Sequence, residues 1–455
     1  MQINPDIFKA YDIRGIYGQD LNDDIAYRLG RAYADLRREE LINKNEINIV
    51  VAEDMRLSSP NLKQFLTKGL TEGGVNVVDI GLASTPTFYF GVAYFKYDGG
   101  IMVSASHNPA EWNGFKLTRE KAIPISGETG ILVLKDNIIA SQFKSAGKIG
   151  KIIEKKDVLN TQIEYDLAYA DIKKIKPLKV VIDPANGMGI LYTEALFENL
   201  PCELTKINFE LDGTFPAHEA DPLKEENLMQ LKRKVSEVGA DLGIATDGDG
   251  DRIFFVDDKG KTIEQSLIRG LLAKIFLREK PGAKICYDIR PGKITRDMIV
   301  ENGGIPIVTR VGHSLIKEQA IKEGAYFAGE SSGHFFLNMD IGCFEVPNIA
   351  ILKLLQEFSE IGMPISQYIK PYQKYSHSGE INSVVTDKNE VFKKLEERYR
   401  DGKISRLDGI TVEYETFWFN VRGSNTEPKI RLNLEAVSEK IMEEKRDEVL
   451  AIIKS

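Results

Sequence analysis

The sequence has few cysteines, no long hydrophobic segment and no excess of positive charge. Its 455 residues include only three cysteines, Cys202, Cys286 and Cys343, and none of them forms a CxxC pair. This scarcity argues against a disulfide framework and against a cysteine-based zinc site. No segment approaches the roughly 18 apolar residues of a membrane-spanning helix, and residues 1–6 lack the basic and then apolar start of a signal peptide. We therefore expect a cytoplasmic protein without a membrane partner.

The net charge of −8 disfavours nucleic acid as a partner, because phosphate backbones are bound by basic surfaces. If the ligand is anionic, the cations that bind it must be gathered locally in a cleft. Charge-rich stretches such as residues 393–398 are interpreted as solvent-exposed helix faces. With 42% hydrophobic and 28% charged residues, the chain is expected to be globular, and its length predicts three or four domains.

A weak internal repeat organises residues 1–370. Three times an apolar strand ends in an acidic turn, and a helix and a second strand follow. The first strands are expected at 49–54, 180–184 and 285–290, and the second strands at 75–80, 202–207 and 305–308. A third strand then leads into a polar loop, at 104–109, 247–252 and 329–334. Strands that alternate with helices form mostly parallel sheets, which bind ligands beyond the carboxyl ends of their strands, so the three loops are expected to share one site.

The C-terminal part has a different pattern. From about Pro371 we expect strands at 380–385, 410–414, 417–421 and 429–434, with one helix at 390–399 and another at the end. Tight turns between short strands indicate an antiparallel sheet with helices on one face. The predicted fold class is α/β: three similar mixed α/β domains with mostly parallel sheets and a C-terminal α+β domain with an antiparallel sheet, around one central cleft. The predicted domains are 1–153, 154–255, 256–370 and 371–455.

The first of these loops carries a candidate nucleophile. Its sequence, Ser104-Ala105-Ser106-His107-Asn108-Pro109, follows the apolar run 99–103, so Ser106 stands at the mouth of a buried strand. A hydroxyl in this position, beside a histidine and a turn-forming asparagine, is typical of a nucleophile that is presented to a ligand. The alternative is an ordinary turn in which the serines cap backbone groups.

The second loop contains Asp247, Asp249 and Asp251 between two apolar strands. Alternating aspartates in an extended segment point one way, and the intervening glycines let the backbone curl until three carboxylates face one hard cation. Mutual repulsion of the carboxylates favours a bound divalent ion, and Mg²⁺ is preferred because three carboxylates leave room for a phosphate oxygen. An EF-hand is disfavoured because Arg252 stands where that loop needs glycine. An Asp/Gly turn without metal is the other alternative.

Three of the five histidines, His107, His313 and His334, lie in candidate loops. His313 is predicted at a strand end that faces the cleft, where its near-neutral pKa suits a ligand or proton-transfer role. The turn at 422–428 offers a guanidinium, two hydroxyls, an amide and backbone N–H groups, which together suit a phosphate. The alternative for this turn is an ordinary hairpin.

In order along the chain, these motifs resemble the α-D-phosphohexomutase family, in its phosphomannomutase/phosphoglucomutase branch. The resemblance covers nearly the whole chain and is carried by residues 8–15, 104–109 with 113–116, 247–252, 329–334 and 422–426. It implies reversible phosphoryl transfer between the 1 and 6 positions of a mannose or glucose phosphate. The implied cofactors are Mg²⁺, phosphorylated Ser106 and a hexose 1,6-bisphosphate as activator. The implied partner is the hexose phosphate substrate, and the chain would be a monomer or a homodimer.

The resemblance also implies roles for individual residues. Catalysis falls to Ser106, Lys116, Arg14 and His313, and the phosphate on Ser106 completes the metal shell of the three aspartates. Lys116 would neutralise the transferring group, while Arg14 and His313 would be the candidates for proton transfer. The residues expected to bind substrate are Lys9, Tyr11, His107, Arg252, Arg290, Glu330, Ser332, His334, Arg422, Ser424, Asn425 and Thr426. Of these, Glu330 and Ser332 would bind sugar hydroxyls, and 422–426 the phosphate that does not react.

Two other classes of protein stay open on the sequence. A metal-dependent nucleotide-sugar transferase would use the aspartate loop without needing Ser106. A non-catalytic protein would bind hexose phosphates or a metal and carry no phosphorylated serine. The choice between mannose and glucose concerns only the C2 hydroxyl of the sugar, and no motif decides it.

Overall fold

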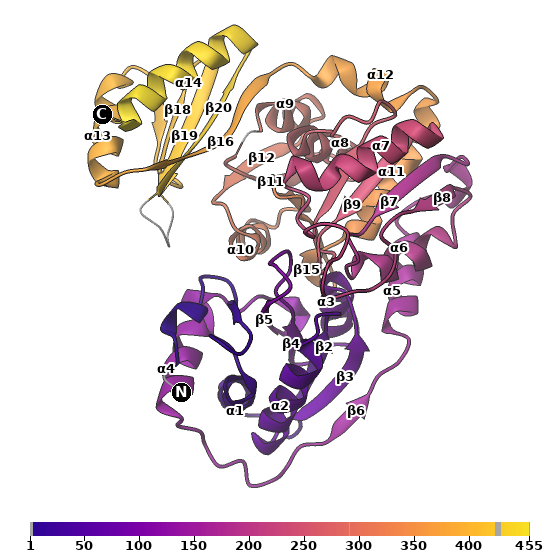
Figure 1. Ribbon diagram of the computed structural model, residues 1–455, viewed down its shortest axis with the longest axis vertical. Helices are drawn as coiled ribbons and strands as arrows, with labels where there is room; N and C mark the ends of the chain where they lie inside the picture. The colour runs from indigo at the N-terminus through magenta and orange to yellow at the C-terminus, as the bar shows by residue number, and fades with distance from the viewer. Residues whose placement is uncertain (1–2, 291, 424–428, 455) are drawn as a thin grey trace.

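The computed structural model describes residues 3–290, 292–423 and 429–454, which form four β-sheets with flanking helices (Figure 1). The first three sheets mix parallel and antiparallel strands, and the fourth is antiparallel throughout. The predicted fold class, three mixed α/β units and a C-terminal antiparallel unit, is therefore confirmed. In the described part of the chain, no helix combines the length and the apolar character needed to cross a membrane.

The first sheet has the strand order β1-β5-β4-β2-β3-β6. The elements of this first unit are β1 (Ile13–Ile16), α1 (Asp23–Glu40), β2 (Asn48–Glu53), α2 (Ser59–Glu72), β3 (Asn76–Leu82), α3 (Thr85–Tyr94), β4 (Gly99–Val103), β5 (Trp112–Arg119), α4 (Leu132–Ala140) and β6 (Ile152–Glu154). Helix α1 begins after Asn22, whose side chain accepts a hydrogen bond from the backbone N–H of Ile25 at 3.0 Å. This cap satisfies one of the free N–H groups at the helix start.

The second and third sheets have the strand orders β10-β9-β7-β8 and β12-β11-β13-β14-β15. The second unit comprises α5 (Val158–Leu167), β7 (Lys179–Asp183), α6 (Gly189–Phe197), β8 (Glu203–Lys206), α7 (Met229–Val238), β9 (Leu242–Thr246) and β10 (Ile253–Val256). The third comprises α8 (Gln265–Glu279), β11 (Lys284–Asp288), α9 (Lys293–Glu301), β12 (Ile305–Thr309), α10 (His313–Glu323), β13 (Phe327–Gly329), β14 (Phe335–Met339), β15 (Gly342–Glu345), α11 (Pro347–Ile361) and α12 (Ile365–Ile369).

The same four-strand arrangement occurs in all three sheets. A parallel trio, β4-β2-β3, β9-β7-β8 or β13-β11-β12, is joined by an antiparallel strand that directly follows the trio's last strand in the chain, namely β5, β10 or β14. The predicted repeat is thus present. Every residue of β4 and β9 is buried, which explains their continuous apolar sequences. The three polar loops follow β4, β9 and β13, at the carboxyl ends of parallel strands.

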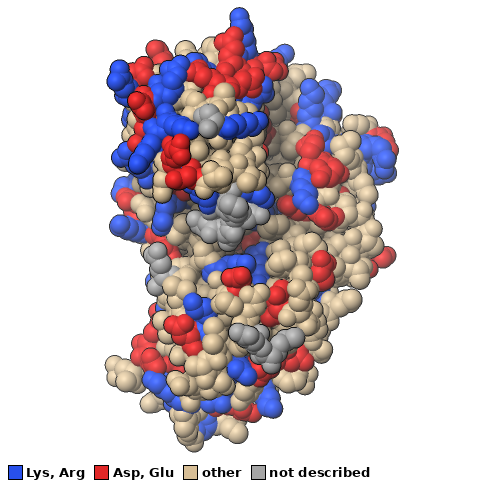
Figure 2. Space-filling view, turned by 60° about the vertical axis from the view of Figure 1, so that its left-hand side comes forward, with Lys and Arg blue, Asp and Glu red and all other residues tan. Residues whose placement is uncertain are grey.

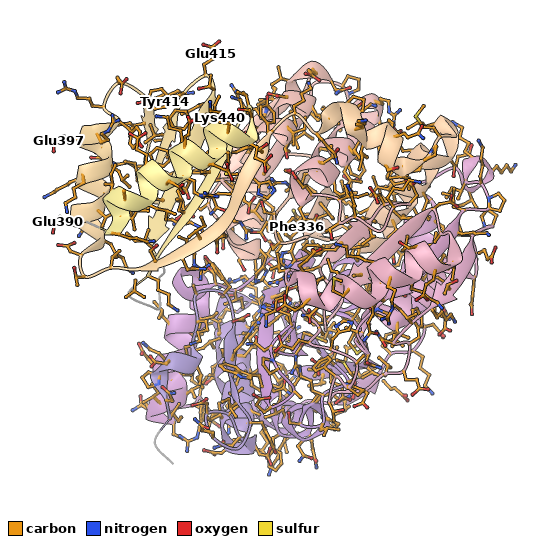
Figure 3. All side chains as sticks on the ribbon, turned by 45° about the horizontal axis from the view of Figure 1, so that its top comes forward. Phe336, Glu390, Glu397, Tyr414, Glu415 and Lys440 are labelled. Carbon is orange, nitrogen blue, oxygen red and sulfur yellow. The ribbon has the colours of Figure 1, made fainter. Side chains whose placement is uncertain are left out.

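The fourth sheet has the order β16-β20-β19-β18-β17. Its elements are β16 (Ser376–Val384), α13 (Lys388–Arg398), β17 (Lys403–Ser405), β18 (Ile410–Glu413), β19 (Phe417–Gly423), β20 (Lys429–Ala436) and α14 (Glu439–Lys454). All predicted strands and helices of this unit are present, and β17 is an additional exposed edge strand of three residues. Glu390 and Glu397 of α13 and Lys440 of α14 point outward (Figure 3), as expected of solvent-exposed helix faces.

The first three units share a core that the fourth does not. One apolar cluster includes Phe88 of α3, Tyr192 of α6, Leu271 of α8 and Ile351 of α11, so it connects the first, second and third units. A separate cluster, which includes Phe419 of β19, lies within the fourth unit. The polar loops of the first three units are therefore positioned by a common core, whereas the fourth unit has a core of its own.

Asp166 of α5 gives this shared core a pH dependence. It is 4% exposed and accepts a hydrogen bond from Nδ2 of Asn348 at 2.8 Å. Burial raises the pKa of Asp166 from 3.8 to about 7, against the opposing hydrogen bonds from Asn348 and Gln162. Because the pKa is higher in the folded state, the stabilisation is complete below about pH 4 and is lost as the pH rises through about 7.

We expect Asp166→Asn to become more stable relative to the wild type as the pH rises. The amide keeps the shape of the carboxyl group but has no charge to bury. Between pH 5 and pH 8 the difference in free energy of unfolding should shift by about 1–3 kcal/mol in favour of the variant, at ~1.4 kcal/mol per unit of pKa. Urea unfolding at both pH values measures it, and a difference that is the same at both would contradict the prediction.

Candidate active site

The first loop places Ser106 against the second unit. Ser106 follows β4, is 2% exposed and has a left-handed backbone with φ of 52°, which is uncommon for a residue with a side chain. Its hydroxyl donates a hydrogen bond to Oδ2 of Asp247 at 2.9 Å and lies 3.3 Å from Nδ1 of His107. Its backbone N–H donates to Oγ of Ser104 at 3.0 Å. The candidate nucleophile of one unit thus touches the candidate metal ligands of the next.

The second loop brings three carboxylates to one point. Asp247, Asp249 and Asp251 lie in the turn between β9 and β10, are at most 1% exposed, and each offers an oxygen within 4.8 Å of the others. The carboxylates converge as predicted, and a glycine lets the backbone curl as predicted, but the conformation expected for the segment differs. The segment is a tight turn rather than an extended strand, and Gly250, with φ of 75°, allows the chain to reverse.

Two basic side chains, Lys116 and His334, compensate the negative charge of the carboxylates. Nζ of Lys116, on β5, lies 2.5 Å from Oδ2 of both Asp249 and Asp251. Burial alone would lower the pKa of Lys116, but the two carboxylates outweigh it and hold that pKa well above its ordinary value. Nε2 of His334 lies 3.1 Å from Oδ1 of Asp251. Burial would raise the pKa of Asp251, yet Lys116 and His334 hold it well below the ordinary range.

The donor set fits a hard divalent cation. Oδ1 of Asp249 is buried and has no hydrogen-bond partner, which is costly for a charged oxygen unless an ion or water reaches it. Burial, then the charges of Asp249 and Asp251, raises the pKa of Asp247 well above its ordinary value, so ionisation of all three carboxylates is unfavourable unless a further cation is bound. Carboxylate oxygens are the ligands that Mg²⁺ and Ca²⁺ prefer. The three aspartates are therefore a candidate metal site.

The third loop is connected to this cluster through His334. Its Nδ1 lies 2.9 Å from Oε2 of Glu330, and the same carboxylate oxygen accepts from Oγ of Ser332 at 3.2 Å. Burial would lower the pKa of His334, but Asp251 and Glu330 raise it to about 9, so the ring is positively charged near neutral pH. Oε1 of Glu330 accepts from the backbone N–H of Gly312 at 2.8 Å. The loop presents hydroxyl, carboxylate and imidazolium groups in a fixed arrangement.

Arg290 lies beside the third loop. Its Nε donates to Oδ2 of Asp288 at 2.5 Å, and Nη2 lies 3.4 Å from Oγ of Ser332. Asp288, at the end of β11, also accepts from Oγ of Ser331 at 2.9 Å and pairs with buried Arg269 of α8. The guanidinium of Arg290 is therefore oriented toward the loop that carries the sugar-binding candidates.

His313 is the first residue of α10 rather than the end of a strand, which corrects its predicted position. Its Nδ1 is buried without a hydrogen-bond partner and lies 3.8 Å from Oε1 of Glu345. Burial, then the charges of Lys317 and Lys116, lowers the pKa of His313 well below its ordinary value, so the ring is neutral. Tyr11 contacts the ring edge to face, with centroids 5.8 Å apart.

The N-terminal motif contacts the first loop through Arg14 of β1. Its side chain forms an ion pair with Asp12 at 2.7 Å and donates to Oδ1 of Asn108 at 2.7 Å. Burial would lower the pKa of Arg14, but the charges of Asp12 and Asp249 raise it. Lys9 lies half-buried just before β1, and its backbone N–H donates to the carbonyl of Asp12 at 2.9 Å. Arg14 is thus a permanent cation beside the Ser106 loop.

The remaining predicted residues divide between two places. Arg252 lies at the end of the aspartate turn, and its backbone N–H donates to Oδ1 of Asp247 at 3.1 Å. Arg422 lies on β19 of the fourth unit and pairs with Glu380 of β16 at 2.5 Å. Ser424, Asn425 and Thr426 lie outside the described residues. Lys and Arg side chains gather where the middle of the face in Figure 2 is hollowed, as expected for a protein that binds an anion despite its net negative charge.

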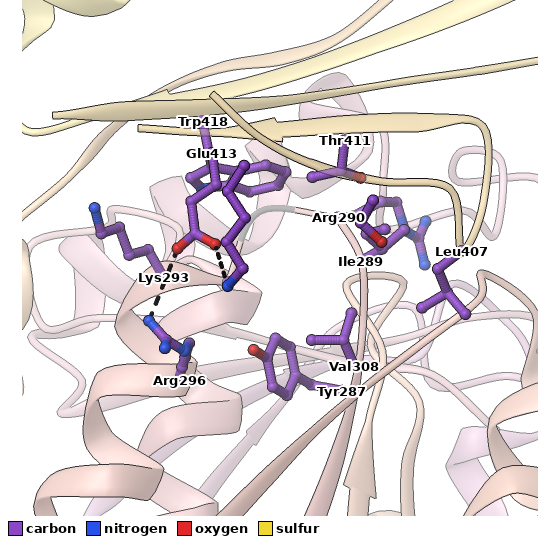
Figure 4. Close-up of a pocket in the computed structure, with 13 residues that line it drawn as sticks. Tyr287, Ile289, Arg290, Lys293, Arg296, Val308, Leu407, Thr411, Glu413 and Trp418 are labelled. Atoms are coloured by element: carbon purple, nitrogen blue, oxygen red, sulfur yellow. Dashed lines mark hydrogen bonds and ion pairs between the residues drawn. The ribbon is translucent and has the colours of Figure 1, made fainter. Parts of the chain in front are cut away.

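A cavity of about 290 Å³ lies between the third and fourth units (Figure 4). Tyr287 and Val308 line it from the third sheet, and Trp418 lines it from the fourth. Arg290 lines the cavity, and its Nη2 lies 3.4 Å from Oγ of Ser332 in the third loop. A change in the contact between these two units would therefore alter the surroundings of Arg290.

Sequence reasoning missed three buried ion pairs around the site. They are Lys317 with Glu345, Arg269 with Asp288, and Arg56 with Asp54. All six side chains are fully buried, and such charges are rarely buried unless they are paired. A charged residue within an apolar element was the available signal: Arg269 lies in a helix segment that is otherwise mostly apolar. Its partner, Asp288, could be identified only from the fold.

Comparison with known proteins gives matches along the whole chain. The phosphoglucomutase/phosphomannomutase models for alpha/beta/alpha domains I, II and III match residues 5–145, 159–260 and 266–375, and the model for the C-terminal domain matches 380–452. A phosphomannomutase of Methanocaldococcus jannaschii is 39% identical over 448 residues, which cover 98% of this chain and 97% of that protein.

Solved structures agree with these matches. A phosphoglucomutase/phosphomannomutase family protein from Burkholderia thailandensis superposes with a TM-score of 0.90 at 32% identity, over 99% of this chain and 98% of that one. An N-acetylphosphoglucosamine mutase of Aspergillus fumigatus, solved with GlcNAc-6P and magnesium, shares the fold with a TM-score of 0.63 at 13% identity, over 98% and 95% of the two chains.

The fold and the site define a phosphohexose mutase, an isomerase with a candidate acidic metal site. The chain belongs to the phosphoglucomutase/phosphomannomutase family. The resemblance inferred from the motifs is thereby confirmed. The nucleotide-sugar transferase and the non-catalytic binding protein are no longer needed as alternatives.

The carboxylate cluster predicts a metal-binding defect in Asp249→Asn. Losing one of three charged ligands should weaken Mg²⁺ binding at least tenfold, or about 1.4 kcal/mol, as measured by isothermal titration calorimetry. The matched control is Asp183→Asn, a carboxyl group 2% exposed at the end of β7 that pairs with His218 at 3.1 Å. If the control loses as much affinity as Asp249→Asn, the three aspartates are not the site.

Proposed function

We propose that this enzyme transfers a phosphoryl group reversibly between the 1 and 6 positions of a hexose phosphate, through phosphorylated Ser106 and a hexose 1,6-bisphosphate. One observation carries the proposal: the hydroxyl of Ser106 is 2.9 Å from a carboxylate of the buried cluster, two of whose aspartates pair with Lys116. A hydroxyl so placed, next to a metal site and a fixed ammonium, suits a stored phosphoryl donor. Phosphoryl transfer depends mainly on positioning and on charge neutralisation.

The proposed substrates are mannose phosphate, glucose phosphate or both. Support for mannose comes from the name of the M. jannaschii relative, which matches this chain over nearly its full length. The 1- and 6-phosphates of one hexose would bind in opposite orientations. The groups that bind the sugar hydroxyls must therefore accept both orientations. Glu330 and Ser332 suit this, because a carboxylate and a hydroxyl can both bond to vicinal sugar hydroxyls.

In the forward step, the phosphorus of phosphorylated Ser106 accepts the free hydroxyl oxygen of the hexose phosphate, and the bond between Oγ and phosphorus breaks. The hydroxyl proton must leave as the new bond forms, and the departing Oγ of Ser106 must take up a proton to become the serine hydroxyl. The bisphosphate then reorients, and its other phosphoryl group returns to Oγ of Ser106. Lys116 and Arg14, both permanently charged, would stabilise the negative charge on the transferring group.

For the proton, we propose neutral His313 as the acceptor. Arg14, the other candidate from the sequence, keeps its proton because Asp12 and Asp249 raise its pKa against the effect of burial. We therefore assign Arg14 an electrostatic role only. Burial and the charges of Lys317 and Lys116 lower the pKa of His313 and keep its ring neutral, so its unpartnered nitrogen is open to accept a proton and to return it in the reverse step.

The cluster Asp247, Asp249 and Asp251 would hold Mg²⁺, in agreement with the magnesium in the A. fumigatus structure. When bound, such an ion supplies positive charge to phosphoryl oxygens. Arg422 and the neighbouring residues 424–426 would bind the phosphate that does not react, together with Arg290. Closure of the fourth unit would keep water from phosphorylated Ser106.

Ser106→Ala should abolish both the phosphorylated form and mutase activity. Intact-mass analysis of the wild type is expected to show one phosphoryl group on part of the population, and the variant should show none, even after incubation with glucose 1,6-bisphosphate. Conversion of mannose 1-phosphate and glucose 1-phosphate to the 6-phosphates should fall by at least about 10⁴-fold, because the covalent route is lost.

The matched control is Ser126→Ala, which removes another buried serine hydroxyl of the first unit, one bonded to Thr129 rather than to the cluster. It should keep both phosphorylation and activity. A Ser106→Ala enzyme that still isomerises either sugar would contradict the phosphoserine route. A wild type that is neither phosphorylated nor active on either sugar would contradict the proposed function itself.

A further inference from the structure

Arg56 donates hydrogen bonds from both of its terminal nitrogens to the loop that carries Ser106. Nη2 donates to the carbonyl oxygens of Ser106 at 2.8 Å and Asn108 at 2.6 Å. Nη1 donates to those of Pro109 at 2.7 Å and Trp112 at 3.0 Å. The guanidinium thus binds three carbonyls of the loop and that of the first residue of β5. The planar, rigid fork of arginine allows this, and the flexible ammonium of lysine does not match it.

The guanidinium is itself held by two further side chains, Asp54 and Phe215. Its Nε lies 3.2 Å from Oδ2 of Asp54, and both side chains are fully buried. Asp54 is fixed in turn, because its Oδ1 accepts from Oγ of Ser59 at 2.6 Å and from the backbone N–H of Arg56 at 3.1 Å. The ring of Phe215, from the second unit, lies 5.0 Å from Cζ of Arg56. Arg56 therefore has a single orientation, and the second unit helps to set it.

The backbone of Ser106 needs such support. Its φ of 52° is unfavourable for a residue with a side chain, and that conformation persists only where surrounding contacts impose it. Oγ of Ser104 binds its N–H at 3.0 Å, and Arg56 binds its carbonyl oxygen. On the other side the carbonyl lies against Gly248, where an added Cβ would come within 2.4 Å of it. These contacts fix the direction in which the Ser106 hydroxyl points.

We propose that Arg56 is the positioning residue that aims Ser106 at the transferring phosphoryl group, an inference that rests on the proposed function. Arg56 bonds to the carbonyls and not to the hydroxyl, so it acts through the loop. Its loss should let Oγ drift from the carboxylate cluster. A misplacement of about 1 Å at a reacting atom can lower the rate by about 10²-fold, whereas binding of the sugar phosphate at Glu330, Ser332 and Arg422 would be unaffected.

The test is Arg56→Lys in the full chain, assayed on mannose 1-phosphate with glucose 1,6-bisphosphate as activator. We expect kcat per folded enzyme to fall by about 10- to 100-fold, while KM stays within about twofold. The rate at which bisphosphate phosphorylates Ser106 should fall in parallel. Amide hydrogen exchange in peptides that cover 104–112 should accelerate, since four carbonyls lose their shared donor, and this readout does not depend on activity.

The matched control is Arg37→Lys. Arg37 is also buried, at 1% exposure, but it donates to the carbonyl of Asp98 and pairs with Glu40 and Glu120, away from the loop. It should lower thermal stability and leave kcat per folded enzyme unchanged. Phe215→Leu removes only the stacking ring and covers the case in which Arg56→Lys does not fold. It should lower kcat by about two- to fivefold with KM unchanged.

The outcomes separate this inference from the proposed function. If the wild type isomerises and folded Arg56→Lys keeps wild-type kcat, or if Arg37→Lys loses as much kcat per folded enzyme, Arg56 is merely structural and the inference is wrong. Wild-type hydrogen exchange in the Arg56→Lys loop would overturn it as well, whatever the activity. An inactive wild type would instead overturn the proposed function, and the loop exchange would still decide whether Arg56 positions Ser106.

Discussion

The structure depends on the contact of one ammonium with two carboxylates. Lys116 of β5 lies 2.5 Å from Asp249 and Asp251, so a strand of the first unit compensates the charge of a turn in the second. Without that ammonium, three buried carboxylates within 4.8 Å of one another would repel and take up protons. The contacts of Lys116 also hold the two units in the arrangement in which the hydroxyl of Ser106 reaches Asp247. Local chemistry and domain arrangement are thus set by the same interaction.

The repeated strand order explains how three similar units each supply one polar loop to the candidate site. In each of them, the polar loop follows the trio's last strand in the chain, which is β4, β9 or β13. The loop therefore lies at the carboxyl end of a parallel strand. The units share one apolar core, so their loops are fixed relative to each other. The fourth unit has its own core and meets the third across a cavity bordered by Arg290. Movement of the fourth unit would thus act first on Arg290 and on the third loop, where the proposed sugar-binding residues lie.

Much of this could be predicted from the sequence, because it is encoded in local patterns. Apolar runs that end in polar turns located β4 and β9, and the alternation of aspartate and glycine located the carboxylate cluster. The role of Arg56 could not be predicted in this way. Its acceptors are backbone carbonyls about fifty residues away. Every residue has a backbone carbonyl, so the sequence does not show which carbonyls accept a hydrogen bond. The pair of Lys317 with Glu345 is similar, since nothing local connects a helix residue to a strand residue that later packs against it.

Thermal unfolding of Lys116→Met, with EDTA and with saturating Mg²⁺, tests the central claim most directly. Removing one partner of a buried ion pair should cost about 3 kcal/mol in EDTA. A divalent ion that binds the same carboxylates would replace the lost positive charge, so Mg²⁺ should restore stability to the variant by more than it stabilises the wild type. If the variant is destabilised equally in both conditions, or if Mg²⁺ affects neither protein, the lysine and the ion do not share the charge of one carboxylate cluster.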